Sequence, residues 1–141
     1  MLRIACPVAA LVVSLAAAGC QVKTAPPPAA PVKPDAVVKA GDLLNEYGTN
    51  AVAADGKYKG KILGVTGKFA SANSTPVVGY SVQLVPEDAG DVNTSGVHCF
   101  IVEAAKDDVG KLQPGQIVTM QGRCDGTGLG QVKLSKCTVV K

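Results

Sequence analysis

Five short segments in which apolar and polar residues alternate dominate the chain from Tyr58 to Val139. Successive side chains of a β-strand point to opposite faces, so this alternation indicates strands with one buried face. Glycine, proline and polar residues separate the segments, as expected of turns. A chain built this way folds into a β-barrel or a β-sandwich. We expect strands within residues 58–69, 80–85, 97–102, 118–124 and 132–139.

Two of these segments change which parity is apolar partway along. In the first, Ile62 shares its parity with Tyr58, whereas Val65 belongs to the other parity, and Gly64 lies between them. The last segment slips at residues 135–136. Such a change indicates a β-bulge or bend, which we place at Gly64 and at residues 135–136.

Helical patterns occur at two places. Leu43, Leu44 and Tyr47 recur at helical spacing, and the predicted helix begins at Asp42 as N-cap, breaks at Gly48 and ends near residue 56. Val37 and Val38 are candidates for extending it backwards. Residues 103–109 form a second, short helical segment between the third and fourth strands.

The order is therefore helix, three strands, short helix and two strands. This order predicts a mainly β fold, a five-stranded Greek-key barrel of the oligonucleotide/oligosaccharide-binding (OB) type, with an N-terminal amphipathic helix. A small open sandwich fits the strand count but gives no reason for the inserted helix.

The N-terminus has the pattern of an export signal. Arg3 precedes an almost wholly apolar stretch, residues 4–18, and small residues lead to Gly19 and Cys20. Two interpretations fit: ordinary secretion with cleavage after a small residue, or a lipoprotein signal in which Cys20 is acylated and becomes the mature N-terminus. The Gly-Cys pair favours the lipoprotein, with a fatty acid such as palmitate as the membrane anchor.

This interpretation divides the chain into three parts. Residues 1–19 are the lipoprotein signal peptide, residues 20–40 are the lipidated cysteine and a tether with five prolines, and residues 41–141 are the OB-fold domain. Gln21 after the cysteine directs a lipoprotein of a Gram-negative cell to the outer membrane. We therefore expect a lipid-anchored protein of the cell envelope, facing the periplasm.

Charge and composition limit the function. The whole chain has net charge +3, but from Gly41 onward ten basic residues balance ten acidic ones. Nucleic-acid binding needs a positive field, so nucleic acid is an unfavoured partner. One histidine, no tryptophan and no second histidine for a catalytic relay give no recognisable catalytic residues, and the sequence predicts no enzyme, no metal and no cofactor.

Cys99, Cys124 and Cys137 fall on the apolar parity of their strands and are expected to point into the barrel. In an oxidising compartment two of them could form a disulfide, and we favour Cys124 with Cys137, although a tight hairpin would place Cys124 opposite a residue near Gln131. A zinc site that joins these cysteines with His98 is disfavoured, because adjacent strand residues face opposite sides.

Lys57, Lys59 and Lys61 share one side of the first predicted strand. They are weak candidates for binding an acidic partner. The plainer interpretation is a solvated strand face that discourages edge-to-edge aggregation.

An ordered set of motifs resembles the tRNA_anti-like OB-fold family from Asp42 to Lys141. The resemblance implies the OB fold and a bacterial lipoprotein, and supplies no catalytic residues. The motifs are Asp42-Leu43-Leu44, Glu46-Tyr47, Tyr58-Lys59-Gly60-Lys61, Val65-Thr66-Gly67-Lys68, Val97-His98-Cys99-Phe100, Leu112-Gln113-Pro114-Gly115-Gln116, Gly122-Arg123-Cys124-Asp125-Gly126 and Leu134-Ser135-Lys136-Cys137.

Two classes of function fit these expectations. The first is a non-catalytic interaction module that binds an unknown protein or glycan at the envelope. The second is an oligonucleotide- or oligosaccharide-binding OB protein.

Overall fold

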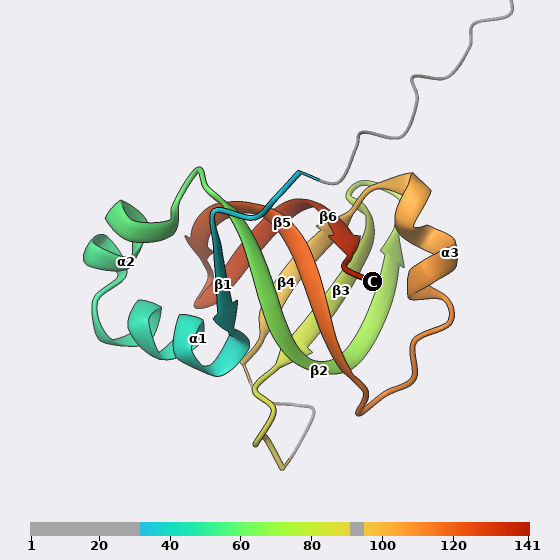
Figure 1. Cartoon of the computed structure of the whole chain (residues 1–141), viewed down its shortest axis with the longest axis horizontal. Helices are drawn as coiled ribbons and strands as arrows, with labels where there is room; N and C mark the ends of the chain where they lie inside the picture. The colour runs from blue at the N-terminus through green and yellow to red at the C-terminus, as the bar shows by residue number, and fades with distance from the viewer. Residues whose placement is uncertain (1–31, 91–94) are drawn as a thin grey trace, which may run out of the picture.

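Five strands close into a barrel in the order β2-β3-β4-β6-β5, and a second pairing of β2, with β5, completes the ring (Figure 1). The computed structural model describes residues 32–90 and 95–141; the predicted signal peptide, Cys20 and most of the tether lie outside these residues. The strands are β1 (Ala36–Lys39), β2 (Ile62–Thr75), β3 (Gly79–Val85), β4 (Val97–Ile101), β5 (Ile117–Gly128) and β6 (Gln131–Val139).

The strand pairing confirms the OB fold. β2 runs antiparallel to β3 and β5, while β4 and β6 are parallel. The short helical segment predicted between the third and fourth barrel strands is present as η1 (Glu103–Ala105) and α3 (Lys106–Val109), between β4 and β5. Within the ring, β2 pairs with two strands: its first half pairs with β5 and its second half with β3.

The bend of β2 lies later than predicted. Its register shifts between Phe69 and Ser71, not at Gly64. Gly64 pairs with Val37 of β1, and a Cβ there would make ordinary van der Waals contact with a methyl of Val37 at 3.4 Å and with the ring of Pro34 at 3.7 Å. Pro34 and Val37 therefore pack against β2 at this point.

The predicted irregularity in the last strand is confirmed. The pairing of β5 with β6 shifts between Gln121 and Arg123, and Lys136 has a positive φ of 53°. The extra residue returns Cys137 to the barrel interior, where its side chain is fully buried.

β1 corrects the prediction that Val37 and Val38 extend the first helix. These residues form a strand that pairs in parallel with β2, with Val38 opposite Val65. β1 lies within residues 20–40, which the sequence assigns to the tether, yet it is part of the fold. Two valines without a longer pattern do not distinguish a helix from a strand.

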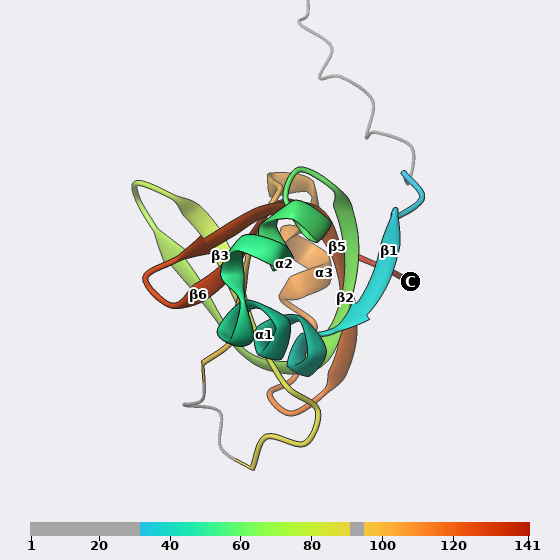
Figure 2. The ribbon, with the colours of Figure 1, turned by 90° about the vertical axis from the view of Figure 1, so that its left-hand side faces the viewer.

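Two consecutive helices, α1 (Ala40–Thr49) and α2 (Ala51–Tyr58), cover one end of the barrel (Figure 2). The predicted helix is present but its boundaries differ. Lys39, not Asp42, is the N-cap of α1, and the break falls at Asn50, whose side chain accepts a hydrogen bond from the Ala53 amide and caps α2. Leu43 and Tyr47 of α1 are buried against the barrel.

The barrel interior is filled with apolar side chains. The completely buried side chains include Leu63, Leu84, Met120 and Leu134, and no polar or charged residue is buried within the described part of the chain. No helix in residues 32–90 and 95–141 is long and apolar enough to cross a membrane.

Candidate binding face

The buried side chains of the barrel interior are apolar, so the polar side chains that could bind a ligand lie on the outer surface of the described residues. The described residues also contain no group of three or more histidine, cysteine or carboxylate side chains arranged to hold a metal ion.

A row of polar side chains crosses four strands on the outside of the barrel. Ser71 of β2 is opposite Gln83 of β3, Gln83 is opposite His98 of β4, and His98 is opposite Lys133 of β6. Their strand neighbours Leu84, Val97, Cys99, Val132 and Leu134 are buried in the core, so these four side chains point outward.

A second row lies beside the first. Ser81 of β3 is paired with Phe100 of β4, and both are partly exposed. Phe100 is the partly exposed aromatic ring of this face, whereas Tyr58 and Phe69 are buried and Tyr80 lies under the Lys106 ammonium, 4.7 Å from the ring centre. The outer face is defined here as Ser71, Ser81, Gln83, His98, Phe100 and Lys133.

Two hairpins flank the barrel on the same side in Figure 2, and both carry exposed apolar tips. The turn between β2 and β3 presents Val77, which is 94% exposed, next to Val78. The turn between β5 and β6 presents Leu129, which is 99% exposed and has a positive φ of 56°. In OB folds these two loops border the face of the second and third barrel strands, here β3 and β4, where ligands bind.

The environment of His98 favours the neutral imidazole. Burial, and secondarily the charge of Lys133, lower the pKa of His98 below its ordinary value. The Nε2 atom is buried and has no hydrogen-bond partner in the described structure. At neutral pH the outer face therefore presents the charge of Lys133 and a neutral ring beside it.

Small residues position the side chains of this face. A Cβ on Gly96 would lie 2.6 Å from the carbonyl oxygen of Leu84 and 2.9 Å from Cγ of Gln83, so only glycine lets β4 begin here. A Cβ on Gly128 would lie 3.0 Å from Nζ of Lys133. The Lys133 ammonium thus lies over the backbone of the β5–β6 hairpin.

The predicted lysine cluster is not on a strand. Lys57 lies in the last turn of α2, Lys59 is its C-cap and Lys61 precedes β2, so the prediction that they share a strand face is wrong. Lys57 pairs with Glu46 at 2.8 Å and Lys59 with Asp55 at 3.5 Å. Because α2 extends to Tyr58, the ammonium groups of Lys57 and Lys59 form ion pairs with carboxylates of the two helices that cover the end of the barrel.

The three cysteines lie in the core, as their parity predicts, and the structure describes all of them as free thiols. Cys137 neighbours Cys99, which together with burial raises the pKa of the Cys137 thiol. Cys124 instead contacts Tyr47, and in the pairing of β5 with β6 it is opposite Leu134. The structure thus brings Cys137 toward Cys99 rather than Cys124, while disulfide formation stays a prediction.

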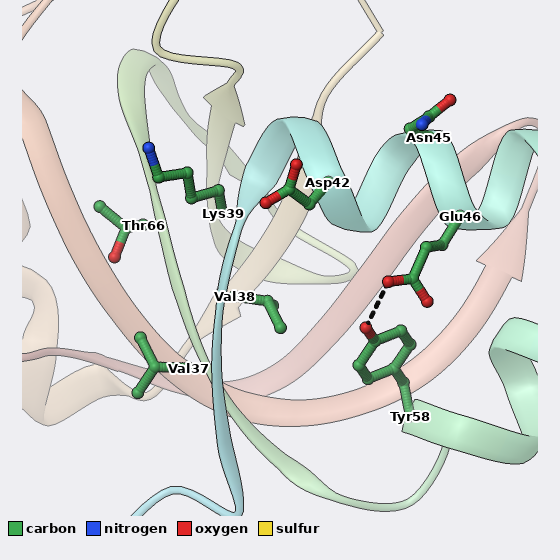
Figure 3. A pocket seen from close by; sticks show the side chains of 8 residues that line it. All are labelled: Val37, Val38, Lys39, Asp42, Asn45, Glu46, Tyr58 and Thr66. Carbon is green, nitrogen blue, oxygen red and sulfur yellow. Dashed lines mark hydrogen bonds between the residues drawn. The ribbon is translucent and has the colours of Figure 1, made fainter.

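A surface hollow lies apart from the outer face, between β1 and the helices (Figure 3). It has a volume of about 550 Å³. Tyr58 donates a hydrogen bond to Glu46 at its inner wall, at 2.8 Å. Its lining residues are Val37, Val38, Lys39, Asp42, Asn45, Glu46, Tyr58 and Thr66.

The sequence motifs include His98 and Phe100 but do not single them out as a site, and they miss Ser71, Gln83 and Lys133. An outward polar residue on one strand carries no signal by itself. Only the register of four strands shows that these residues are neighbours.

The closed five-stranded barrel with a helix inserted between its third and fourth strands is an OB fold. The sequence profile of the tRNA_anti-like family matches residues 1–138, and the chain belongs to this family. No curated protein matches the chain in sequence.

One solved structure supports the same fold, and a second match is more distant. A protein from Klebsiella pneumoniae, provisionally named a nucleic acid-binding lipoprotein, superposes with a TM-score of 0.62 at 19% identity, over 74% of this chain and 92% of that one. The Stn1–Ten1 complex of Schizosaccharomyces pombe matches with a TM-score of 0.41 at 10% identity, over 57% of this chain and 58% of that one.

Proposed function

We propose that this protein is a non-catalytic binding module that a lipid anchor holds at the bacterial cell envelope, and that the outer face is its ligand site. The observation that carries the proposal is the polar row of Ser71, Gln83, His98 and Lys133, which is partly exposed together with Phe100 on the outside of a barrel with an apolar interior. A ligand of this face meets hydrogen-bonding groups, one cation and one aromatic ring.

The anchor follows from the N-terminal sequence. Residues 1–19 act as the signal peptide, Cys20 carries the acyl chains, the proline-rich tether spaces the domain from the bilayer, and residues 41–141 are the OB-fold domain. The relative from Klebsiella pneumoniae is named a lipoprotein, which supports a location at the cell envelope. Gln21 favours the outer membrane, with the domain in the periplasm.

The ligand class we favour is a glycan or protein of the envelope. Amide, hydroxyl and imidazole groups beside a single ring suit a sugar or a peptide backbone, which offer many hydrogen bonds and little charge. The second candidate is single-stranded nucleic acid. The cation of Lys133 and the ring of Phe100 on the same face, and the name of the Klebsiella relative, favour it, whereas one aromatic ring and a balanced charge give few stacking and phosphate contacts.

Site-specific photo-crosslinking in the intact envelope tests the ligand site. A photoreactive residue at position 83 of the full-length lipoprotein is expected to give a discrete crosslinked product, and the same residue at exposed position 111 is expected to give none. Loss of the product in Phe100→Ala would tie it to the outer face. Equal products at positions 83 and 111 would contradict the proposal.

A titration separates the two ligand classes. Fluorescent single-stranded DNA and RNA are mixed with the purified protein at low and high salt. Binding that weakens steeply with salt, and that Lys133→Ala weakens while Lys111→Ala does not, would establish the nucleic-acid class. No binding up to high micromolar protein is the result we expect.

Fractionation tests the anchor. Cys20→Ser is expected to move the protein from the membrane pellet to the soluble fraction, and metabolic labelling with a tagged fatty acid is expected to mark only the wild type. A Cys20→Ser protein that stays in the pellet would contradict lipidation at this residue.

A further inference from the structure

β1 is an edge strand with one side unpaired. It pairs with β2 alone, and no other described strand pairs with it. Alternate backbone N–H and C=O groups of an edge strand point away from the sheet and are free to pair with another chain. Val37 on this strand is 67% exposed.

The hollow described above lies along this edge. Figure 3 shows β1 facing α1 and Tyr58 across it, with Val38 directed toward the Tyr58 ring. One wall is therefore a strand edge and the other is a helix. Several peptide-binding domains use this arrangement, in which an extended peptide pairs with the strand and places alternate side chains in the groove.

The charged side chains that line the groove indicate which kind of ligand it favours. Asp42 and Glu46 line it, and Asp42 forms no ion pair within the described residues. Lys39 is directed to Glu87, 3.5 Å away, at the rim. A neighbouring hollow that shares Asp42 and Asn45 adds Glu87 and Asp88, so carboxylates outnumber ammonium groups around the first turn of α1.

The carboxylate of Glu46 is held in place. It accepts hydrogen bonds from Lys57 at 2.8 and 2.9 Å and from the Tyr58 hydroxyl at 2.8 Å. Asp42 in the exposed first turn of α1 is thus the acidic group free to meet an incoming cation.

We propose that this groove binds an extended basic peptide, which adds as a strand to the outer edge of β1 and places a lysine or arginine side chain beside Asp42. The surface is distinct from the outer face, which β3, β4 and β6 form with the second half of β2. The protein would then recognise an envelope polypeptide independently of the ligand of the outer face.

Fluorescence anisotropy with the full-length protein in detergent tests this directly. The probe is a labelled six-residue peptide of alternating valine and lysine. Two matched peptides serve as controls, one with glutamate in place of lysine and one with N-methylated backbone amides. We expect micromolar binding of the lysine peptide and at least about tenfold weaker binding of both controls.

Two variants locate the site. Asp42→Asn is expected to weaken binding of the lysine peptide by about threefold to fivefold, as for an exposed ion pair, while Asp107→Asn in α3 leaves it unchanged. Val38→Pro removes a backbone donor of β1 and is expected to abolish binding; its circular dichroism melt reports whether the barrel stays folded.

Each alternative outcome overturns the proposal. These outcomes are no binding of the lysine peptide, equal binding of the glutamate or N-methylated peptide, and equal effects of Asp42→Asn and Asp107→Asn. Lys133→Ala and Phe100→Ala are expected to leave peptide binding intact, so failure of the proposed outer-face function does not affect this test.

Discussion

The hydroxyl oxygen of Tyr47 lies 3.5 Å from the sulfur of Cys124, and this buried contact joins α1 to β5. Burial, followed by the contact with Cys124, raises the pKa of Tyr47, so the phenol stays protonated across the physiological range. The end of the barrel is thereby closed by an aromatic side chain from outside the five-stranded ring.

Shortening Tyr47 tests this closure. Tyr47→Phe removes only the polar contact and is expected to cost about 1 kcal/mol of unfolding free energy. Tyr47→Ala also leaves a cavity and is expected to cost about 3–5 kcal/mol. Chemical denaturation measures both, with Val52→Ala on the exposed side of α2 as a neutral control. Equal losses for the two Tyr47 variants would mean that the ring does not fill the barrel end.

Glu46 is expected to make stability sensitive to acid. The hydrogen bonds from Lys57 and then Tyr58 lower the pKa of Glu46 below its ordinary value of 4.5. A lowered pKa in the folded state means that the contribution is complete above pH 4.5 and is lost as the pH falls through the folded value. Glu46→Gln should therefore show a shallower fall of melting temperature below pH 4.5 than wild type, whereas Asp107→Asn should follow wild type.

Gly122 is expected to tolerate no side chain. A Cβ there would lie 2.4 Å from the Cys137 sulfur and 2.9 Å from the Ser135 carbonyl oxygen. Gly122→Ala should cost about 1–3 kcal/mol by overpacking, and Cys137→Ala in the same chain should recover part of that loss. Gly48→Ala, where a Cβ meets nothing within 4 Å, should stabilise the helix by about 0.5–1 kcal/mol. Additive effects of Gly122→Ala and Cys137→Ala would refute the contact.

The thiols of Cys99, Cys124 and Cys137 should resist alkylation in the folded protein, because all three are fully buried. Iodoacetamide labelling followed by intact mass measurement checks this, with an unfolded sample as the reference. If the protein is unfolded without reductant and all three barrel cysteines are labelled, they are the free thiols of the structure. If only one barrel cysteine is labelled, the other two form the disulfide predicted from the sequence. Rapid labelling of the folded protein would contradict the burial.

The barrel could be predicted from the sequence because each strand carries its own alternation. Parity alone predicts that Cys99, Cys124 and Cys137 lie in the core, and a change of parity predicts the bulge near Lys136. β1 could not be predicted, since Val37 and Val38 form a strand by pairing with Gly64 and Val65 of β2, far along the chain.

The candidate site was less predictable for a related reason. Lys57, Lys59 and Lys61 alternate as strand residues do, but α2 continues to Tyr58 and the alternation is accidental. Ser71 and Lys133 become neighbours only after four strands are in register. Pairing over long sequence distances carries no local signal.

Chain entry through β1 has a mechanical consequence. The ring of five strands starts at Ile62, and the described elements before it, β1, α1 and α2, lie outside that ring. A pull along the N-terminal segment would load the short ladder between β1 and β2 first. That ladder can peel away while β2, β3, β4, β6 and β5 stay joined, so traction on the leading segment would leave the strands that bear the outer face undisturbed.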